Sequence, residues 1–390
     1  MMLDGLNSPT GPKNATPTVL HVYKDVAPAV KGGIENQIDL LRHAVPGVTA
    51  NVVVCARDRR TIQADVAGGR EVRVAELGPR PWSVPLAPAL PSWVRRTPGD
   101  VVHLHMPNPP GEAAVMVAAR ERPLVVSYHA DIVRQARLER AYRPLVRACL
   151  RRANAIVVGS EALAEGSPAL QPHRDRVRLI RHAVDVDRYR PEAVSDEDRH
   201  ALRERYGAPL VIAVGRLVYY KGFEILIEAA RGLDASVVIV GAGPLESKLR
   251  GLSRNVPNVH MTGELPEDEL IAHLAAADCF AFSSTSRAES FGIAVAEAQA
   301  MGLPAVVTEI GTGSTEAIDP GRSGVAVPPG NPRALRDALA GLLTDPGRLR
   351  AMGEEGRRRA VSRHALAERA EEWRLLYAEL AGASRTASTA

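Results

Sequence analysis

The sequence predicts an α/β fold made of two doubly wound domains that face each other across a cleft. Three observations lead to this fold class. The chain has 390 residues, and one domain usually takes roughly 100–200. Short runs of Val, Ile and Leu alternate with amphipathic segments of helical length, which is typical of β-α-β units around a parallel sheet. The alternation pauses in a charged segment near residue 190 and then starts again.

The first series of elements lies within residues 18–190, the expected N-terminal domain. Its strand-like runs are almost continuously apolar, as in strands that helices cover on both faces. These runs are TVLHVY (18–23), NVVVC (51–55), VVHLH (101–105), PLVVSYH (123–129) and AIVVGS (155–160). Helical segments at Glu35–Ala44 and Glu112–Arg122 lie between them. Residues 1–17 are polar and rich in Pro, Gly and Asn, so we expect a disordered leader and no signal peptide.

The second series lies within residues 191–364, the expected C-terminal domain. Segment Arg190–Arg205 is charged and contains Pro191, which suits a linker followed by a first helix. The strand-like runs are PLVIAVG (209–215), SVVIVG (236–241), NVHMTG (258–263), CFAFSS (279–284) and PAVVTE (304–309). The helical segments between them are about Gly222–Gly232, Leu245–Leu252, Pro266–Ala276 and Ile293–Met301. Residues 365–381 form a final amphipathic helix that either ends this domain or crosses back to the first, and 382–390 read as a disordered tail.

Composition argues against several classes of protein. Aromatic residues make up 4% of the chain, which leaves little for base stacking, so we expect no nucleic-acid partner. The net charge of +4 is compatible with phosphate-bearing ligands or an anionic membrane and demonstrates neither. The three cysteines are widely spaced among apolar residues and suit reduced core thiols. No run approaches the ~20 apolar residues of a spanning helix. We therefore expect a cytoplasmic protein without a metal site.

Two cationic residues follow the carboxyl end of the first strand in the second series. Arg216 follows the run that ends at Gly215, and Lys221 stands at the start of the next helical segment. Positive side chains beside the positive end of a helix suit a diphosphate group. Solvated surface charge is the alternative, because Arg and Lys side chains are usually exposed.

The first series offers two candidates at strand ends, where doubly wound sheets bind ligands. Gly32 and Gly33 precede a helical segment, and residues without side chains let backbone N–H groups approach an anion. His129 ends the run PLVVSYH. A glycine-permitted turn and a structural histidine are the respective alternatives.

Two glutamates lie in and after a loop of the second series. Glu289 opens the tetrapeptide Glu-Ser-Phe-Gly, and Glu297 lies one turn inside the following helical segment. Carboxylates accept hydrogen bonds from sugar hydroxyl groups, each contributing about 1.5–3 kcal/mol when charge-assisted. One glutamate would hold a hexose and the other a ribose. The alternative is a carboxylate favoured by the helix dipole plus a solvated helix residue.

A dinucleotide-binding reading of residues 241–246 is weak. Gly241 and Gly243 follow a strand-like run, but Glu246 stands where the third glycine of the fingerprint belongs. We interpret these glycines as a tight turn between strand and helix and expect no NAD cofactor.

The segment Arg134–Arg152 is strongly basic, with seven arginines against one acid, Glu139. Apolar residues recur within it at helical spacing. A basic amphipathic helix suits an anionic lipid surface, where a lipid-linked acceptor would reside. A solvated face above a core stripe is the alternative, and both interpretations stay open.

Together, these residues resemble the GT-B glycosyltransferases of family 4, a large group of retaining enzymes that use nucleotide sugars. The matching motifs follow the family's order between about Thr18 and Tyr377. They are Gly32-Gly33-Ile34-Glu35, His129, Gly215-Arg216-Leu217 with Lys221-Gly222, Glu289-Ser290-Phe291-Gly292, and Glu297. No single motif is decisive, but five at consistent spacing are specific. The resemblance implies the GT-B fold, in which two Rossmann-like domains face each other.

The resemblance also implies roles for the matching residues. Those implied in catalysis are His129, Arg216, Lys221 and Glu289. Those implied in donor binding are Gly32, Gly33, Gly215, Gly263, Glu264, Leu265, Ser290, Phe291, Gly292 and Glu297. Arg216 and Lys221 would hold the donor diphosphate. Glu289 would bind the hexose and Glu297 the ribose, while His129 would lie near the reacting carbon and residues 263–265 near the base.

The implied activity is transfer of a hexosyl group, with retention, from a GDP- or UDP-sugar to a hydroxyl acceptor. Two fixed cations would stabilise the leaving diphosphate, so no metal cofactor is expected. The stretches HVYKDVAP, HADIVRQ and EIGTGS look similar to bacterial cell-surface mannosyl- and rhamnosyltransferases, which favours glycan or glycolipid assembly at the membrane. Aminoglycoside glycosyltransferases share the main motifs and are an alternative. A sugar-nucleotide epimerase and a non-catalytic sugar-nucleotide-binding protein are the alternatives from other classes.

Overall fold

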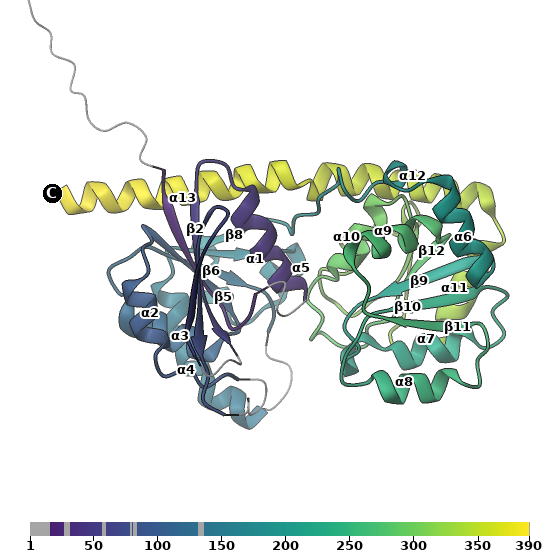
Figure 1. Ribbon diagram of the computed structural model, residues 1–390, viewed down its shortest axis with the longest axis horizontal. Helices are drawn as coiled ribbons and strands as arrows, with labels where there is room; N and C mark the ends of the chain where they lie inside the picture. Colours follow the sequence, from purple (N-terminus) through teal and green to yellow (C-terminus); the bar gives the residue numbers. More distant parts are fainter. Residues whose placement is uncertain are drawn as a thin grey trace, which may run out of the picture.

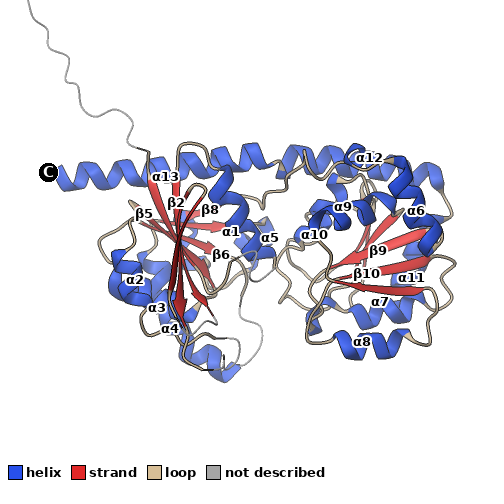
Figure 2. Ribbon diagram, in the orientation of Figure 1, coloured by secondary structure: helices blue, strands red, loops and turns tan. Residues whose placement is uncertain are grey.

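The computed structural model describes residues 16–26, 32–56, 60–78, 80, 84–131 and 136–389. Two α/β domains lie side by side, and the last two helices run along them, Pro346–His364 beside the second domain and Leu366–Thr389 beside the first (Figure 1). Each domain has one mainly parallel sheet with helices on both faces (Figure 2). The predicted fold class is thereby confirmed.

The sheet of the first domain has the strand order β3-β4-β2-β1-β5-β6-β7-β8, and only β3 and β4 are antiparallel. The strands are β1 (Thr18–Val22), β2 (Thr49–Ala56), β3 (Ile62–Val66), β4 (Gly69–Ala75), β5 (Val101–Met106), β6 (Leu124–Tyr128), β7 (Ala155–Val158) and β8 (Val177–Leu179). Strands β3, β4 and β8 were not predicted from the sequence. Strand β3 is almost wholly exposed and β8 has only three residues, so neither has the apolar run by which buried strands are recognised.

Helices cover both faces of this sheet. They are α1 (Gly33–Ala44), α2 (Leu90–Arg96), α3 (Pro109–Ala118), α4 (Ala136–Arg152) and α5 (Glu161–Gly166). Leu20 and Leu104 point to the core shared with α2, α3 and α4, whereas Val19 and Val101 point to the opposite core. Helix α3 begins before the expected Glu112, because the Asn108 side chain accepts a hydrogen bond from the Gly111 N–H and caps it.

Helix α4 contains most of the basic segment. Val146, Cys149 and Leu150 are buried against the first domain, while Arg147 and Arg151 are exposed. Arg134 lies outside the described residues, so contact of this segment with a membrane stays a prediction. Throughout the described part of the chain, no helix combines the length and apolarity needed to cross a bilayer.

The sheet of the second domain has six parallel strands in the order β11-β10-β9-β12-β13-β14. They are β9 (Leu210–Val214), β10 (Ser236–Val240), β11 (Val259–Gly263), β12 (Cys279–Phe282), β13 (Ala305–Thr308) and β14 (Gly324–Val327). The helices are α6 (Asp196–Tyr206), α7 (Phe223–Ala230), α8 (Glu246–Ser253), α9 (Glu267–Ala276), α10 (Ile293–Ala300), α11 (Pro332–Leu343) and α12 (Pro346–His364). The strand order reverses between β9 and β12, so the loops after these two strands meet at one edge.

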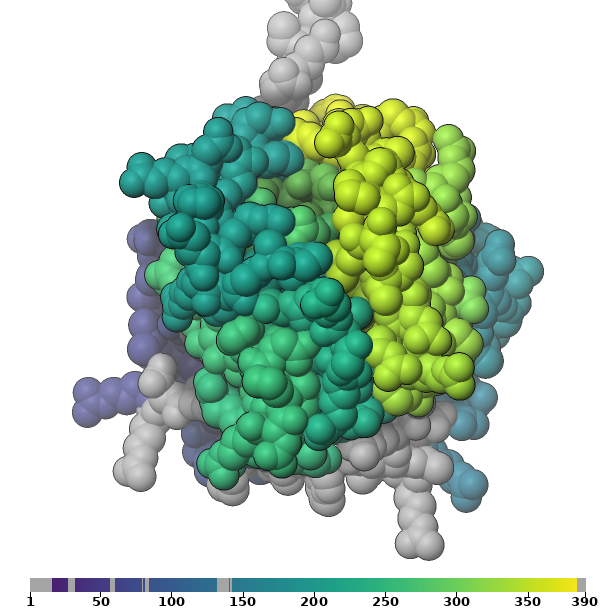
Figure 3. All heavy atoms as spheres, turned by 90° about the vertical axis from the view of Figure 1, so that its right-hand side faces the viewer, coloured from purple at the N-terminus to yellow at the C-terminus, as the bar shows by residue number. Residues whose placement is uncertain are grey.

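The last helix, α13 (Leu366–Thr389), crosses back to the first domain. Trp373, Leu376 and Tyr377 are buried against the sheet residues Val19 and Val101. Figure 3 views the molecule from the second domain's end and shows yellow spheres of the C-terminal region lying against that domain as well. The helix continues past the expected end at 381, because no proline follows to stop it.

The chain passes between the domains twice, and both passages lie together. Val184 and Ala365 form a parallel bridge, and the Val184 N–H donates to the His364 carbonyl at 2.7 Å. Also between the domains, Glu316 of the second domain accepts hydrogen bonds from the backbone N–H groups of Glu161 and Ala162, at 3.0 and 2.5 Å. The first turn of α5 is therefore held by a carboxylate of the other domain.

Two adjacent leucines test whether α13 stabilises the first domain. Leu376 is 6% exposed and Leu375 is 55% exposed. We expect Leu376→Ala to lower the free energy of unfolding by about 2–5 kcal/mol, because it leaves a cavity in a packed core. Leu375→Ala should change it by less than about 0.5 kcal/mol. Urea denaturation measures both, and equal effects would contradict the docking of α13.

Candidate active site

A cleft of about 880 Å³ lies between the two domains. It is lined by loops that follow the carboxyl ends of the strands in both sheets. The residues predicted from the sequence that line it are Gly32, Gly33, His129, Gly215, Arg216, Lys221, Glu264, Leu265, Glu289, Ser290, Phe291, Gly292 and Glu297. Gly263 ends β11 next to this wall, with a φ of 80°. The structure thus brings together residues that are up to 265 positions apart, from Gly32 to Glu297.

An ion pair joins two of these residues. Lys221 lies in the turn after β9, and Glu289 lies in the loop between β12 and α10. The Lys221 Nζ is 2.5 Å from the Glu289 Oε2, and both side chains are largely buried, with 14% and 11% of their surface exposed. Arg216, by contrast, is exposed at the cleft. A diphosphate and a sugar hydroxyl would each find a charged partner at the Lys221–Glu289 pair.

Two helix N-termini from opposite domains face each other at the cleft. Helix α1 begins at Gly33 and α10 at Ile293; a Cβ atom added to Gly33 would lie 3.2 Å from the Ile293 Cδ1. Gly292 has a φ of 76°, and a Cβ atom there would be 2.7 Å from the Phe282 ring. Unpaired N–H groups and the dipole make such N-termini favourable for anions. These N-termini lie in the same cleft as Arg216 and Lys221, although Lys221 is paired there with Glu289.

Glu297 lies in the cleft wall and not on a solvated helix face. Burial raises the pKa of its carboxyl group to about 7, and the nearby Glu267 adds to this effect, while Lys221 opposes it. The carboxyl group therefore titrates near neutral pH when the cleft holds no ligand. An ionised Glu297 accepts hydrogen bonds from two adjacent hydroxyl groups, as a ribose presents them.

The raised pKa of Glu297 predicts how stability depends on pH. The folded protein keeps this proton up to about pH 7, whereas the unfolded chain loses it near pH 4.5. The stabilisation is complete below the lower value and is lost as the pH rises through the upper one. In Glu297→Gln this loss, about 1–3 kcal/mol, should disappear. Urea denaturation between about pH 5 and 8 measures the difference; parallel curves would contradict it.

His129 directly follows strand β6 at the cleft and is 8% exposed. Its ring stacks on that of His182, with centroids 6.1 Å apart. Burial lowers the pKa of His129 to about 3 and that of His182 to about 4. Both rings are therefore neutral at physiological pH and offer one hydrogen-bond donor and one acceptor each.

Several residues that line the cleft were given no role from the sequence, although Glu35 belongs to the motif Gly32-Gly33-Ile34-Glu35 noted there. Asp25 and Glu35 are 7% and 8% exposed, and burial raises the pKa of the Glu35 carboxyl group. The Arg80 Nη1 is 2.8 Å from the Asp25 carboxylate, and its Nη2 is 2.5 Å from Glu76. Asp25 lies shortly after the first strand, where doubly wound sheets bind ligands, so the sequence could have indicated it. No sequence motif around Arg80 indicates that its side chain reaches the cleft, because that contact depends on the tertiary structure.

Comparison with known proteins agrees with this architecture. A family model described as Glycosyltransferase Family 4 matches residues 31–188, and one described as Glycosyl transferases group 1 matches residues 194–359. The D-rhamnosyltransferase WbpZ of Pseudomonas aeruginosa is 33% identical over 87% of this chain and 90% of its own length. The O-antigen chain mannosyltransferase C of Escherichia coli is 31% identical over 87% of this chain and 92% of its own.

A solved structure shows the same fold at lower identity. Sucrose-phosphate synthase from Thermosynechococcus elongatus has a TM-score of 0.80 with 20% identity, covering 94% of this chain and all of that one. The family expected from the sequence motifs is thereby confirmed. The chain belongs to the GT-B glycosyltransferases of family 4, and it is a glycosyltransferase.

Proposed function

We propose that the protein transfers a mannosyl or related hexosyl group from a GDP- or UDP-sugar to a hydroxyl group, with retention, in the assembly of a cell-surface glycan or glycolipid. The observation that carries this proposal is the Lys221–Glu289 pair in a cleft beside Arg216. The relatives' names, a rhamnosyltransferase and a mannosyltransferase, support the choice of sugar.

In the proposed reaction, the bond between the anomeric carbon and the donor phosphate oxygen breaks while the acceptor oxygen bonds to the same carbon. The acceptor hydroxyl attacks on the face from which the diphosphate departs, and its proton passes to the departing phosphate oxygen. Negative charge grows on the diphosphate, where Lys221, Arg216 and the helix N-termini stabilise it. These fixed positive groups serve the role that a metal ion serves elsewhere, so we propose no metal requirement.

Glu289 and Glu297 are assigned to hydroxyl groups of the donor and not to a nucleophile. When the diphosphate binds Lys221, Glu289 would lose its ion pair with that lysine and accept a hydrogen bond from a hexose hydroxyl instead. Glu297 would bind the ribose from α10. Residues 264 and 265, which also line the cleft, would lie against the base.

Incubation with a panel of GDP-, UDP- and TDP-sugars tests the proposal. We expect transfer to an added acceptor, or slow donor hydrolysis without one. NMR of the transfer product should show the same anomeric configuration as in the donor sugar. An epimerised donor would establish an epimerase. Binding without turnover of any donor, in the presence of lipid-linked and soluble acceptors, would overturn the assignment as an active transferase.

A further inference from the structure

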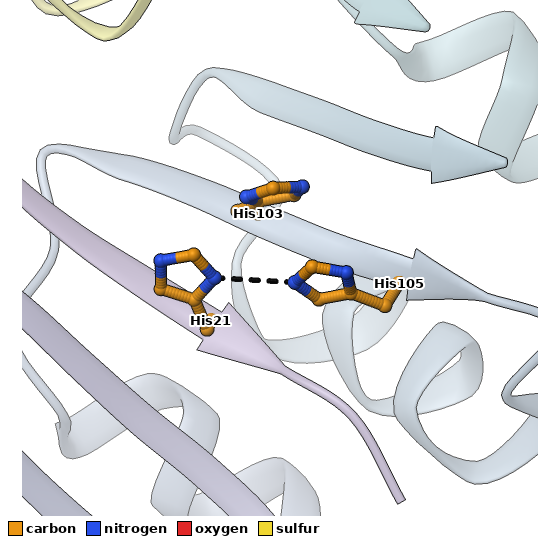
Figure 4. Close-up of side chains that lie close together, drawn as sticks. All are labelled: His21, His103 and His105. Carbon is orange, nitrogen blue, oxygen red and sulfur yellow. Dashed lines mark hydrogen bonds between the residues drawn. The ribbon is translucent and has the colours of Figure 1, made fainter. Parts of the chain in front are cut away.

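Three histidines form a hydrogen-bonded row that leads from the cleft into the first domain. The His129 Nε2 lies 3.2 Å from the His105 Nδ1, and the His105 Nε2 lies 3.1 Å from the His21 Nδ1. Figure 4 shows the second of these contacts between strands β1 and β5, with His103 beside it. The row therefore joins a residue of the cleft to the interior of the sheet.

Each ring in the row is neutral and buried. His21 and His105 are each 2% exposed. Burial lowers the pKa of His21 to about 3 and holds that of His105 well below its ordinary value. A neutral imidazole carries one N–H donor and one bare nitrogen, which accepts. Each contact therefore needs a donor on one ring and an acceptor on the next.

Only two proton arrangements satisfy both contacts. If all three rings carry the proton on Nε2, His129 donates to His105 and His105 donates to His21. If all three carry it on Nδ1, both hydrogen bonds reverse. Any mixture opposes two N–H groups or two bare nitrogens, and buried polar groups are rarely left unpaired in this way. The tautomer of His129 is therefore tied to that of His105 and His21.

We propose that His105 and His21 are positioning residues that tie the tautomer of His129 to their own, so that the hydrogen-bonding state its Nδ1 presents to the donor sugar is set by the whole row. The contact of His129 with the sugar rests on the proposed function, whereas the coupling of the three tautomers does not. A wrong tautomer would replace a favourable contact with an opposed pair at the reacting sugar.

A fourth histidine, His103, packs against this row. Its ring stacks on His105 with centroids 4.1 Å apart. The Tyr377 hydroxyl and the Ser127 hydroxyl each lie 2.7 Å from one of its ring nitrogens. Because Tyr377 belongs to α13, the C-terminal helix fixes the ring that holds His105 in place.

A metal ion is the competing explanation for this cluster. The nearest ligand atoms of His21, His103 and His105 lie within 4.8 Å of one another. Zinc binds imidazole nitrogen at about 2.0–2.1 Å, which requires three bare nitrogens converging on one point. Both His103 nitrogens are already paired with hydroxyl groups, and one nitrogen of His21 faces His105. The geometry therefore favours the hydrogen-bonded row.

Two substitutions of one residue separate its two contacts. An Asn side chain ends near the position of a histidine Nδ1 and a Gln side chain near that of Nε2. His105→Asn should thus keep a partner for His129, and His105→Gln should keep one for His21. We expect His105→Gln to lower kcat for donor turnover by about 10- to 100-fold, the loss typical when the partner that orients a functional histidine is removed. His105→Asn should retain about tenfold more of kcat than Gln does.

Matched controls account for folding and for the general effect of losing a histidine. Both variants bury one amide, so a shared folding defect lowers Tm and kcat equally in both. His260, on β11 of the other domain, is replaced by Asn and by Gln, and neither change should alter kcat. Equal losses of kcat in His105→Asn and His105→Gln would overturn the positioning role.

The ring nitrogens report the tautomers directly by NMR of protein with ¹⁵N-labelled histidine. We expect His21, His105 and His129 to share one tautomer, and His129 to become a mixture in His105→Gln. Different tautomers in the unaltered protein, or one zinc ion per chain in protein purified without chelators, would overturn the proposal. If no donor is turned over, the proposed function fails while the NMR result still decides the coupling.

Discussion

Glu289→Gln is expected to lower kcat for glycosyl transfer by about 10²–10³-fold while the protein stays folded. The change keeps the size of the side chain and an acceptor oxygen but removes the charge. Loss of one preorganised polar group at a reacting centre costs roughly 2.7–4 kcal/mol in the transition state. It also leaves the Lys221 ammonium, now 2.5 Å from the carboxylate, without its counter-charge.

Steady-state kinetics with the preferred donor measure this effect, with urea denaturation as the test of folding. Glu269→Gln is the matched control, since Glu269 is exposed on α9 and should leave kcat unchanged. Near-normal turnover by Glu289→Gln would remove Glu289 from the donor site.

Lys221→Met is expected to lower kcat by a similar factor, about 10²–10³-fold, for a different reason. The substituted side chain keeps the aliphatic length but cannot stabilise charge on the leaving diphosphate. Binding of the product nucleoside diphosphate should weaken as well, whereas binding of the nucleoside alone should not change. Isothermal titration with each compound separates the two.

Lys248→Met serves as the control for the loss of a lysine. Lys248 is 61% exposed and pairs with Glu224 at 3.2 Å on the outer side of the domain. The double variant at positions 221 and 289 should lose less than the product of the two single losses, because directly paired residues are not additive. Strict additivity would show that the two side chains act independently.

Part of the site could be predicted from the sequence, because doubly wound sheets bind ligands at the carboxyl ends of their strands. Arg216 and Glu289 follow buried parallel strands, so periodicity alone places them at one edge of the second sheet. The pairing of Lys221 with Glu289 was not foreseen, because the two were assigned to different parts of the donor. Whether a carboxylate meets an ammonium depends on side-chain rotamers that a motif does not specify.

The contacts within the histidine row could not be predicted from the sequence. His105 lies in an apolar strand run and has no neighbour in sequence that signals a contact with His129 or His21. Its partners become visible only when the registers of β1, β5 and β6 are known. Similarly, residues 365–381 are amphipathic whichever domain they cover, so the sequence left the destination of the last helix open.

The bridge between Val184 and Ala365 constrains how the two halves of the enzyme can move. Because the two covalent passages lie together there, this spot would serve as the hinge in any closure of the cleft. The hydrogen bonds from the α5 amides to Glu316 lie close to the same spot, because Arg359 of α12 donates to the Glu316 carbonyl, and they would strengthen this hinge.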